Sequence, residues 1–236
     1  CMVWGLLPQL RLPARAAEEH NGHTGWTQLK NSTSTINGGN YYLNSTVTAN
    51  KSITVSGNVT LCLNGYTLNI GQNTTLTVSS GATLTICDCQ SGGTITGTES
   101  YSGLNVISVT GGTLNLESGT ISSTASRSGS LISVTDGGAL NVTGGTISLN
   151  HTGKVAQSGV QAVELSNSTG NFTGGEVSLT TAVDNARATT VYQEGGRVTV
   201  GGSAEISFDW TIENDSTATP GSGALCVTKD GSVTLE

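Results

Sequence analysis

The sequence predicts an all-β protein that folds as a parallel β-helix, a solenoid in which short strands stack turn upon turn. One segment occurs twice in nearly the same form: "GGTLNLESGTI" begins at Gly111 and "GGALNVTGGTI" begins at Gly137, 26 residues later. Apolar and polar residues alternate within each copy, which is typical of strands with one buried face. Glycine borders the alternating stretches, where corners need a positive φ or a close backbone approach.

The same segment returns along most of the chain. "GNFTGGEVSL" from Gly170 aligns with "LNVTGGTISL" from Leu140, and "GGRVTV" from Gly195 and "DGSVTL" from Asp230 repeat its first half. "GATLTI" from Gly81 is an earlier copy, which is followed by the insert "CDCQS". We therefore expect a right-handed parallel β-helix of about seven turns, with three short strands in each turn.

The alternation also assigns side chains to the inside or the outside of the solenoid, because successive residues of a strand point to opposite faces. Six residues are expected to point inward: Leu114, Leu116, Ile121, Leu140, Val142 and Ile147. Four are expected to point outward: Thr113, Asn115, Asn141 and Ser148.

Composition supports this fold and argues against one class of partner. The 236 residues include 33 glycines, while aromatic residues make up 4% and charged residues 11%, less than half the usual charged share. Regularly placed Val, Ile and Leu argue against a disordered chain. The net charge is −7 and the nine Lys and Arg residues are thinly spread. A basic patch that follows phosphates is therefore not expected, and neither is a nucleic-acid partner.

Three regions are expected along the chain. Residues 1–17 start apolar and end in "ARAA", which is typical of the remnant of a secretory signal peptide, with a frayed apolar tail as the alternative. Residues 18–52 are less regular and are expected to form an N-terminal cap or first irregular coil. Residues 53–236 are expected to form the β-helix and to be truncated at the C-terminus, because "GALCVTKDGSVTLE" begins a fresh turn.

The signal-like start predicts a secreted or cell-surface protein. No stretch reaches the roughly 18 apolar residues that a membrane helix requires, so we expect no membrane insertion within this chain.

The cysteines predict a disulfide. Cys62 and Cys87 are expected to point outward one turn apart, with their Cα atoms about 4.8 Å from each other, which is within the range of a disulfide. A Cys62–Cys87 or Cys62–Cys89 bond is therefore expected in a secreted protein. Cys226 is expected to have no partner. The alternative is a zinc site. We favour a polar cap without metal because the spacing of the possible ligands is loose: Glu18, Glu19, His20, His23, Cys87 and Cys89.

Charged residues gather where the repeat length varies, after the third strand of each turn. These segments are expected to emerge along one side of the solenoid, where insertions often form a binding surface, although long loops are also polar simply because they are solvated. The candidate ligand-binding residues are Glu99, Tyr101, Arg127, His151, Lys154, Asp184 and Arg187.

No catalytic constellation is expected. A polysaccharide lyase needs clustered Asp residues to bind calcium and a basic residue to act as the catalytic base. The only candidates for these roles are Asp136, Asp184 and Arg187. A glycoside hydrolase needs carboxylates about 5 to 9.5 Å apart, whereas Asp209 and Glu213 are about 13 Å apart along a strand. We therefore expect no cofactor, and calcium would enter only with a lyase.

Several motifs carry a family resemblance: "HTGWTQL", "GGNYYL", "VTLCLNGYTLNI" and "GATLTICDCQSGGTITG". The chain resembles the right-handed parallel β-helix of the pectin-lyase-like superfamily, and more narrowly the secreted β-helix surface proteins of Gram-positive gut bacteria. In that group the residue after "LNG" is often His, where this chain has Tyr66. None of the matching motifs is catalytic, so no catalytic residue carries over.

The resemblance implies a large modular protein with an adhesive or carbohydrate-binding role. We therefore expect a non-enzymatic surface module that presents its variable loops to a glycan or to another host or microbial surface ligand. The alternatives are a polysaccharide lyase or glycoside hydrolase of the β-helix type, and a passive structural stalk.

Overall fold

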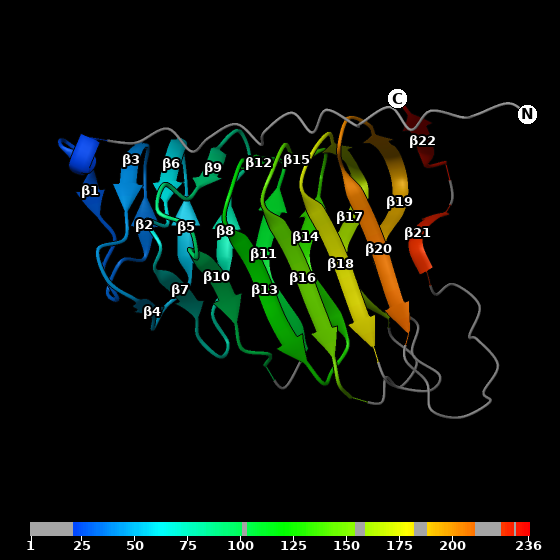
Figure 1. The fold of residues 1–236 in the computed structure, drawn as a ribbon, viewed down its shortest axis with the longest axis horizontal. Helices are drawn as coiled ribbons and strands as arrows, with labels where there is room; N and C mark the ends of the chain where they lie inside the picture. The colour runs from blue at the N-terminus through cyan, green and yellow to red at the C-terminus, as the bar shows by residue number, and fades with distance from the viewer. Residues whose placement is uncertain (1–20, 101–102, 154–158, 182–187, 211–222, 229) are drawn as a thin grey trace, which may run out of the picture.

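The computed structural model describes residues 21–100, 103–153, 159–181, 188–210, 223–228 and 230–236. Over these residues the chain is an all-β parallel solenoid, as predicted, and its turns are stacked along one axis from β1 to β22 (Figure 1). The described helical structure is a single 3-10 turn, η1 (Asn21–His23). Described strands pair in parallel, and the isolated bridge between Ser100 and Gly103 is antiparallel.

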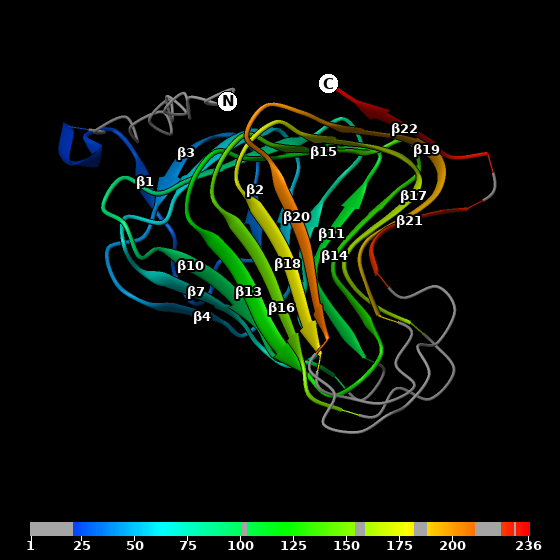
Figure 2. The ribbon, with the colours of Figure 1, turned by 45° about the vertical axis from the view of Figure 1, so that its right-hand side comes forward.

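The strands form two sheets, of which the smaller has seven strands. Figure 2 shows this sheet on the near side of the solenoid, with β11 and β14 behind it. Its strands in stacking order are β4 (Val47–Ala49), β7 (Thr67–Ile70), β10 (Thr94–Gly97), β13 (Thr120–Ala125), β16 (Thr146–His151), β18 (Glu176–Thr181) and β20 (Glu205–Trp210).

The fifteen-stranded sheet supplies the other two faces of each turn, which we call rows one and two. Row one begins with β1 (Thr27–Gln28), β3 (Gly39–Tyr42), β6 (Asn58–Cys62), β9 (Thr83–Cys87), β12 (Thr113–Leu116) and β15 (Ala139–Val142). Row two begins with β2 (Thr35–Ile36), β5 (Ile53–Val55), β8 (Leu76–Val78), β11 (Leu104–Thr110) and β14 (Gly129–Thr135). Both rows continue in β17 (Val160–Phe172) and β19 (Ala188–Val200), and then in β22 (Ser232–Leu235) and β21 (Gly223–Thr228).

The number of regular turns is smaller than the seven expected. Four described turns, from β3 to β14, consist of three separate strands each, and a fifth, from β15 to β17, ends in a strand that runs on into the next turn. After them, row two of one turn and row one of the next share one 13-residue strand, first β17 and then β19. The parallel pairing of β17 with β19 continues through the corner, from Ser166 with Glu194 to Ser168 with Gly196, so the corner no longer interrupts the strand.

The predicted inward and outward residues are placed as expected. All six predicted inward residues have no exposed surface, and they stack in register, as Leu114 does between Leu84 and Leu140. Burying one such side chain stabilises the fold by about 1.5 to 3 kcal/mol. On the outside, Asn141 donates a side-chain hydrogen bond to Asn115 at 2.8 Å, and Asn171 donates one to Asn141 at 2.8 Å. An asparagine ladder therefore adds polar bonds between turns to the apolar column inside.

Candidate functional site

The connections that lead from the seven-stranded sheet to row two lie at one corner of the solenoid, which we call the loop edge. Their described residues are 50–52, 71–75, 98–100, 103, 126–128, 152–153 and 159. Glu99 follows β10, Arg127 follows β13 and His151 ends β16, so the fold brings these three predicted residues to the same corner of successive turns. Four other predicted residues belong to these connections but lie outside the described residues: Tyr101, Lys154, Asp184 and Arg187.

Glu99 fastens one turn of the loop edge to the next. Its carboxylate accepts hydrogen bonds from the backbone N–H groups of Ser126 at 2.8 Å and Arg127 at 2.9 Å, and from the Ser126 hydroxyl. Partial burial opposes the charged form of Glu99, but these hydrogen bonds and the positive charge of Arg127 outweigh it and lower the pKa of Glu99. Arg127 is exposed. Of this pair, Glu99 shapes the edge and Arg127 is presented to solvent.

His151 lies inside the solenoid, with no exposed surface. Its Nδ1 lies 3.3 Å from the hydroxyl oxygen of Thr181, and its Nε2 has no hydrogen-bond partner among the described residues. Burial lowers the pKa of His151, and the charge of Glu99 only partly offsets this effect. The side chain is therefore held neutral beneath the loop edge and does not form part of its surface.

A pH prediction follows from the burial of His151. The unfolded chain binds a proton at this residue below its ordinary pKa of 6.5, while the folded chain does so only at lower pH. The stability linked to the neutral form of His151 is therefore expected to be fully present above pH 6.5, and the free energy of unfolding is expected to fall as the pH drops below that value. Urea unfolding of wild type and His151→Leu at pH 7.5 and 5.5 measures this, and the variant is expected to lose less stability over this interval.

Glu99→Gln provides the control for this prediction. Glu99 does not itself titrate between pH 7.5 and 5.5, because its pKa is lowered from the ordinary value of 4.5. Its charge favours the protonated form of His151, so this variant is expected to lose at least as much stability over the interval as wild type, in contrast to His151→Leu. An equal loss of stability in wild type and His151→Leu would contradict the role given to His151.

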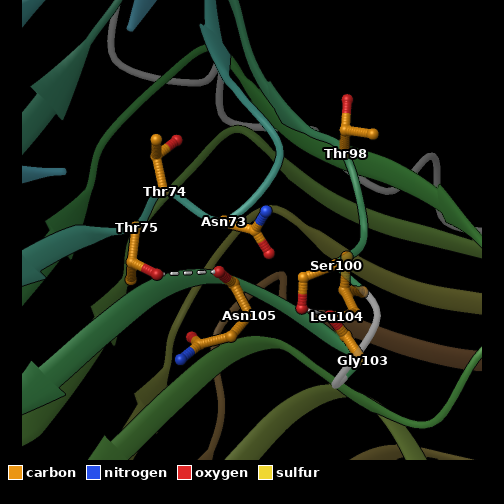
Figure 3. Close-up of a pocket in the computed structure, with 8 residues that line it drawn as sticks. All are labelled: Asn73, Thr74, Thr75, Thr98, Ser100, Gly103, Leu104 and Asn105. Carbon is orange, nitrogen blue, oxygen red and sulfur yellow. Dashed lines mark hydrogen bonds between the residues drawn. The ribbon is translucent and has the colours of Figure 1, made fainter. Parts of the chain in front are cut away.

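A pocket of about 430 Å³ opens at the loop edge, between the connection after β7 and the connection after β10. Figure 3 shows its lining residues, with the Thr75 hydroxyl donating to the backbone oxygen of Asn105 at 3.2 Å. Ser100 donates to the backbone oxygen of Gly103 at 2.9 Å and so fixes the opposite wall. The lining is polar and contains no charged side chain among the residues described: Asn73, Thr74, Thr75, Thr98, Ser100, Gly103, Leu104 and Asn105.

Sequence reasoning missed the wall of this pocket that residues 71–75 provide. The predicted binding residues stand in segments marked by charge and variable repeat length, and "GQNTT" shows neither. Its place in the repeat was the signal that could have found it, since residues 71–75 leave the seven-stranded sheet just as residues 98–103 do one turn later.

The structure does not assemble the set of residues considered for a lyase. Asp136 lies at the corner between β14 and β15, not at the loop edge, and it has a positive φ of 55°. Its side chain is exposed, and a carboxylate oxygen lies 3.4 Å from the hydroxyl of Thr135. This is the turn role expected of Asp before two glycines. The other two members, Asp184 and Arg187, lie outside the described residues.

A second cluster of reactive side chains lies near the N-terminal end of the solenoid. Cys62 ends β6 and Cys87 ends β9, and the two are directly paired in the parallel ladder, one turn apart as expected. However, they are not exposed as their outward direction predicted: Cys62 is 0% exposed and Cys87 is 7% exposed. Neither belongs to the apolar core. On the outward side, Cys89 lies against Cys62 and His23 lies against Cys89.

Three potential ligand atoms of this cluster lie within 4.8 Å of one another: a ring nitrogen of His23, Cys62 Sγ and Cys89 Sγ. The two sulfurs are 3.1 Å apart, and Cys89 Sγ lies 3.7 Å from His23 Nε2. Cys62, Cys87, Cys89 and Cys226 are not joined in disulfides in this structure, and the Cys62 disulfide remains a prediction. Residues Glu18, Glu19 and His20 lie outside the described part of the chain.

The thiols of the cluster differ in acidity. A hydrogen bond from Cys87 is the main reason why the pKa of Cys62 is lowered to about 4, with burial opposing it and contacts with His23 and Cys89 assisting. The same hydrogen bond, followed by burial, raises the pKa of Cys87. Burial first, and then the contact with Cys62, raise the pKa of Cys89 to about 12. Cys62 is therefore the thiolate of the group, and its neighbours stabilise its charge.

Asp88, between Cys87 and Cys89, fixes the backbone of this segment. It is 4% exposed, and its carboxylate oxygens accept hydrogen bonds from the backbone N–H groups of Gly65 and Gly93, each at 2.7 Å. Its own backbone N–H donates to the hydroxyl of Ser118 at 2.8 Å. Asp88 is the only charged residue from Ser52 to Thr98. That isolation was a signal of a structural carboxylate, and sequence reasoning did not use it.

No protein-family model, curated protein or solved structure matches this chain. The structure shows a parallel β-solenoid, and the resemblance to pectin-lyase-like surface proteins remains an expectation from the sequence motifs. Within the described ranges, no helix is long and apolar enough to cross a membrane.

Proposed function

We propose that this solenoid is a secreted or cell-surface binding module that holds carbohydrate at its loop edge without cleaving it. The observation that carries the proposal is the polar pocket between residues 71–75 and 98–105. Its volume of about 430 Å³ lies in the range of small-molecule sites. Hydroxyl and amide side chains line it in place of the apolar groups that most such sites present, which suits a neutral ligand rich in hydroxyl groups.

The scaffold supports the same function. Binding residues are found disproportionately on loops that a rigid framework positions, and here stacked strands flank the described residues of the loop edge. Glu99 adds fixed contacts between the turn that carries the pocket and the next one, where Arg127 is exposed. A ligand longer than one sugar unit could thus contact several turns, which is how an adhesin binds a polysaccharide chain.

The test is an array of plant, host and microbial glycans, incubated with the full chain and calcium, and read both for retained protein and for released sugar. We expect retention without release. Asn73→Ala and Asn105→Ala are expected to weaken retention about tenfold each, since each removes an exposed amide at the pocket. Asn58→Ala is the matched control, because Asn58 is also exposed but lies in β6 of row one.

Other outcomes would replace the proposal. Release of oligosaccharides would indicate a hydrolase, or a lyase if the release needs calcium. An absence of both retention and release would favour a passive stalk. Retention that is unchanged in both pocket variants would move the binding surface away from this pocket.

A further inference from the structure

We propose that His23, Cys62 and Cys89 form a binding site for a divalent zinc ion. Their donor atoms, one imidazole nitrogen and two sulfurs, lie within 4.8 Å of one another although the residues come from three separate segments of the chain. His23 lies in η1, Cys62 ends β6 and Cys89 follows β9. This proposal does not rest on the carbohydrate-binding function, since the site belongs to the N-terminal turns of row one and not to the loop edge.

The donor set matches the chemistry of zinc. Thiolate sulfur and imidazole nitrogen are its usual protein ligands, at about 2.3 Å and 2.1 Å. Tetrahedral angles then place two sulfurs about 3.8 Å apart, and a sulfur and a nitrogen about 3.6 Å apart. The distance from Cys89 Sγ to His23 Nε2 is 3.7 Å, and that from Cys62 Sγ to Cys89 Sγ is 3.1 Å. The distance from Cys89 Sγ to His23 Nε2 already fits a tetrahedral zinc site. The two sulfurs would need to move apart by about 0.7 Å.

The surroundings hold the imidazole in place. The ring of His23 stacks on Tyr42 with centroids 4.6 Å apart and planes 9° apart, and it meets the edge of Trp26 at 5.2 Å. His23 is 8% exposed and Cys62 is 0% exposed, so the site excludes most water. An imidazole held by aromatic rings loses little freedom when it binds a metal, which favours binding.

The segment that carries Cys89 is also held in place. Asn64 donates its side-chain N–H to the backbone oxygen of Leu43 at 2.9 Å, and its own oxygen lies 3.5 Å from Cys89 Sγ. Asp88 fixes the backbone next to Cys89 through Gly65 and Gly93. Such contacts around the ligands orient metal sites and are part of their affinity.

The ion would fasten the N-terminal end of the solenoid. His23 and Cys89 are 66 residues apart, and Cys62 and Cys89 are 27 residues apart, so one ion would join η1 to two later turns. An end turn is paired on one side only and is the first part of a solenoid to fray. Zinc that binds the folded state alone would raise the stability of this end.

A disulfide is the competing outcome, because a Cys62–Cys87 or Cys62–Cys89 bond would consume the sulfur that the metal needs. The first experiment therefore uses the full chain purified without reductant. It is loaded with zinc and passed through a desalting column, and its metal content and thiol state are measured. We expect about one zinc per chain and no disulfide at Cys62 in peptide mass mapping. A mapped disulfide at Cys62, or free thiols that retain no zinc, would overturn the proposal.

Variants then assign the ligands. Cys62→Ser, Cys89→Ser and His23→Ala are expected to retain less than about a tenth of the wild-type zinc, while Cys226→Ser is the matched control and is expected to retain all of it. Cys226 lies in β21, far along the solenoid. Circular dichroism confirms that each variant is folded before its metal is counted. Full zinc retention in Cys62→Ser or Cys89→Ser would contradict the assignment.

Two readouts do not depend on the variants. Co²⁺ added in place of zinc is expected to give the visible bands of a tetrahedral site and a thiolate charge-transfer band, whereas octahedral Co²⁺ without the thiolate band would contradict the proposed donors. Zinc is also expected to raise Tm by about 5 °C or more, and EDTA is expected to reverse the rise. The same rise in Cys62→Ser would place the effect elsewhere.

Discussion

Gly175→Ala is expected to lower the free energy of unfolding by about 3 to 5 kcal/mol, whereas Gly137→Ala is expected to lower it by about 1 to 2 kcal/mol. The two glycines have nearly the same backbone conformation, with φ of 75° and 76°. The strain of a side chain in this left-handed region is therefore common to both substitutions. The difference between them measures what the stacking of turns adds.

Stacking adds a clash that the backbone cannot relieve. A Cβ at position 175 would lie 2.6 Å from the carbonyl oxygen of Gly145, one turn below, while a Cβ at position 137 would have no atom within 4 Å. The Gly145 oxygen accepts the backbone N–H of Glu176 at 3.0 Å. Moving that oxygen away from a new methyl group would break a hydrogen bond of the ladder between turns.

Urea unfolding followed by circular dichroism gives both free energies at one protein concentration. A solenoid can unfold in stages, so equal slopes with respect to urea are checked before the midpoints are compared. Similar midpoints for the two variants would show that the turns tolerate a methyl group between them. The spacing of the corner glycines would then reflect backbone conformation alone.

The sequence predicted best those parts of the fold that depend on residues close together in the chain. The alternation in "TLNL" and "ALNV" depends on neighbouring residues only, and it placed Leu114 and Leu140 in the core without error. The number of regular turns depends on more than local pattern. Whether a corner interrupts the strand is decided by pairing with the next turn, as between Ser166 and Glu194, and so β17 and β19 run on where two short strands were expected.

The sites were less predictable because they depend on distant contacts. The alternation correctly directs Cys62 away from the core, but only the approach of His23, 66 residues before Cys89, shows that this outward face is covered. Likewise, His151 was selected for its position in a variable segment, while the buried contact with Thr181 comes from a strand one turn later. The sequence thus assigned Cys62 and His151 to the correct turns of the solenoid, but it did not show which side chains cover them.

Asp88→Asn is expected to lower the free energy of unfolding by about 2 to 4 kcal/mol. In the native chain one oxygen accepts the N–H of Gly65 and the other accepts that of Gly93, each at 2.7 Å. An asparagine offers one oxygen only, and its NH₂ group would face a second donor. The variant therefore loses a charge-assisted bond and gains a repulsive contact beside Gly93, which is buried.

Asp136→Asn is the matched control, since Asn tolerates its positive φ as well as Asp does, and its exposed carboxylate meets only the hydroxyl of Thr135 among the contacts described. It is expected to change stability by less than about 0.5 kcal/mol. Urea unfolding of both variants without metal measures the contribution of the carboxylate alone. Repeating it with zinc tests whether Asp88 also positions Cys89, because a positioning role predicts weaker zinc binding in Asp88→Asn and unchanged binding in Asp136→Asn. Equal stability of the two variants would contradict the role of Asp88 as the link between the turns of β6 and β9.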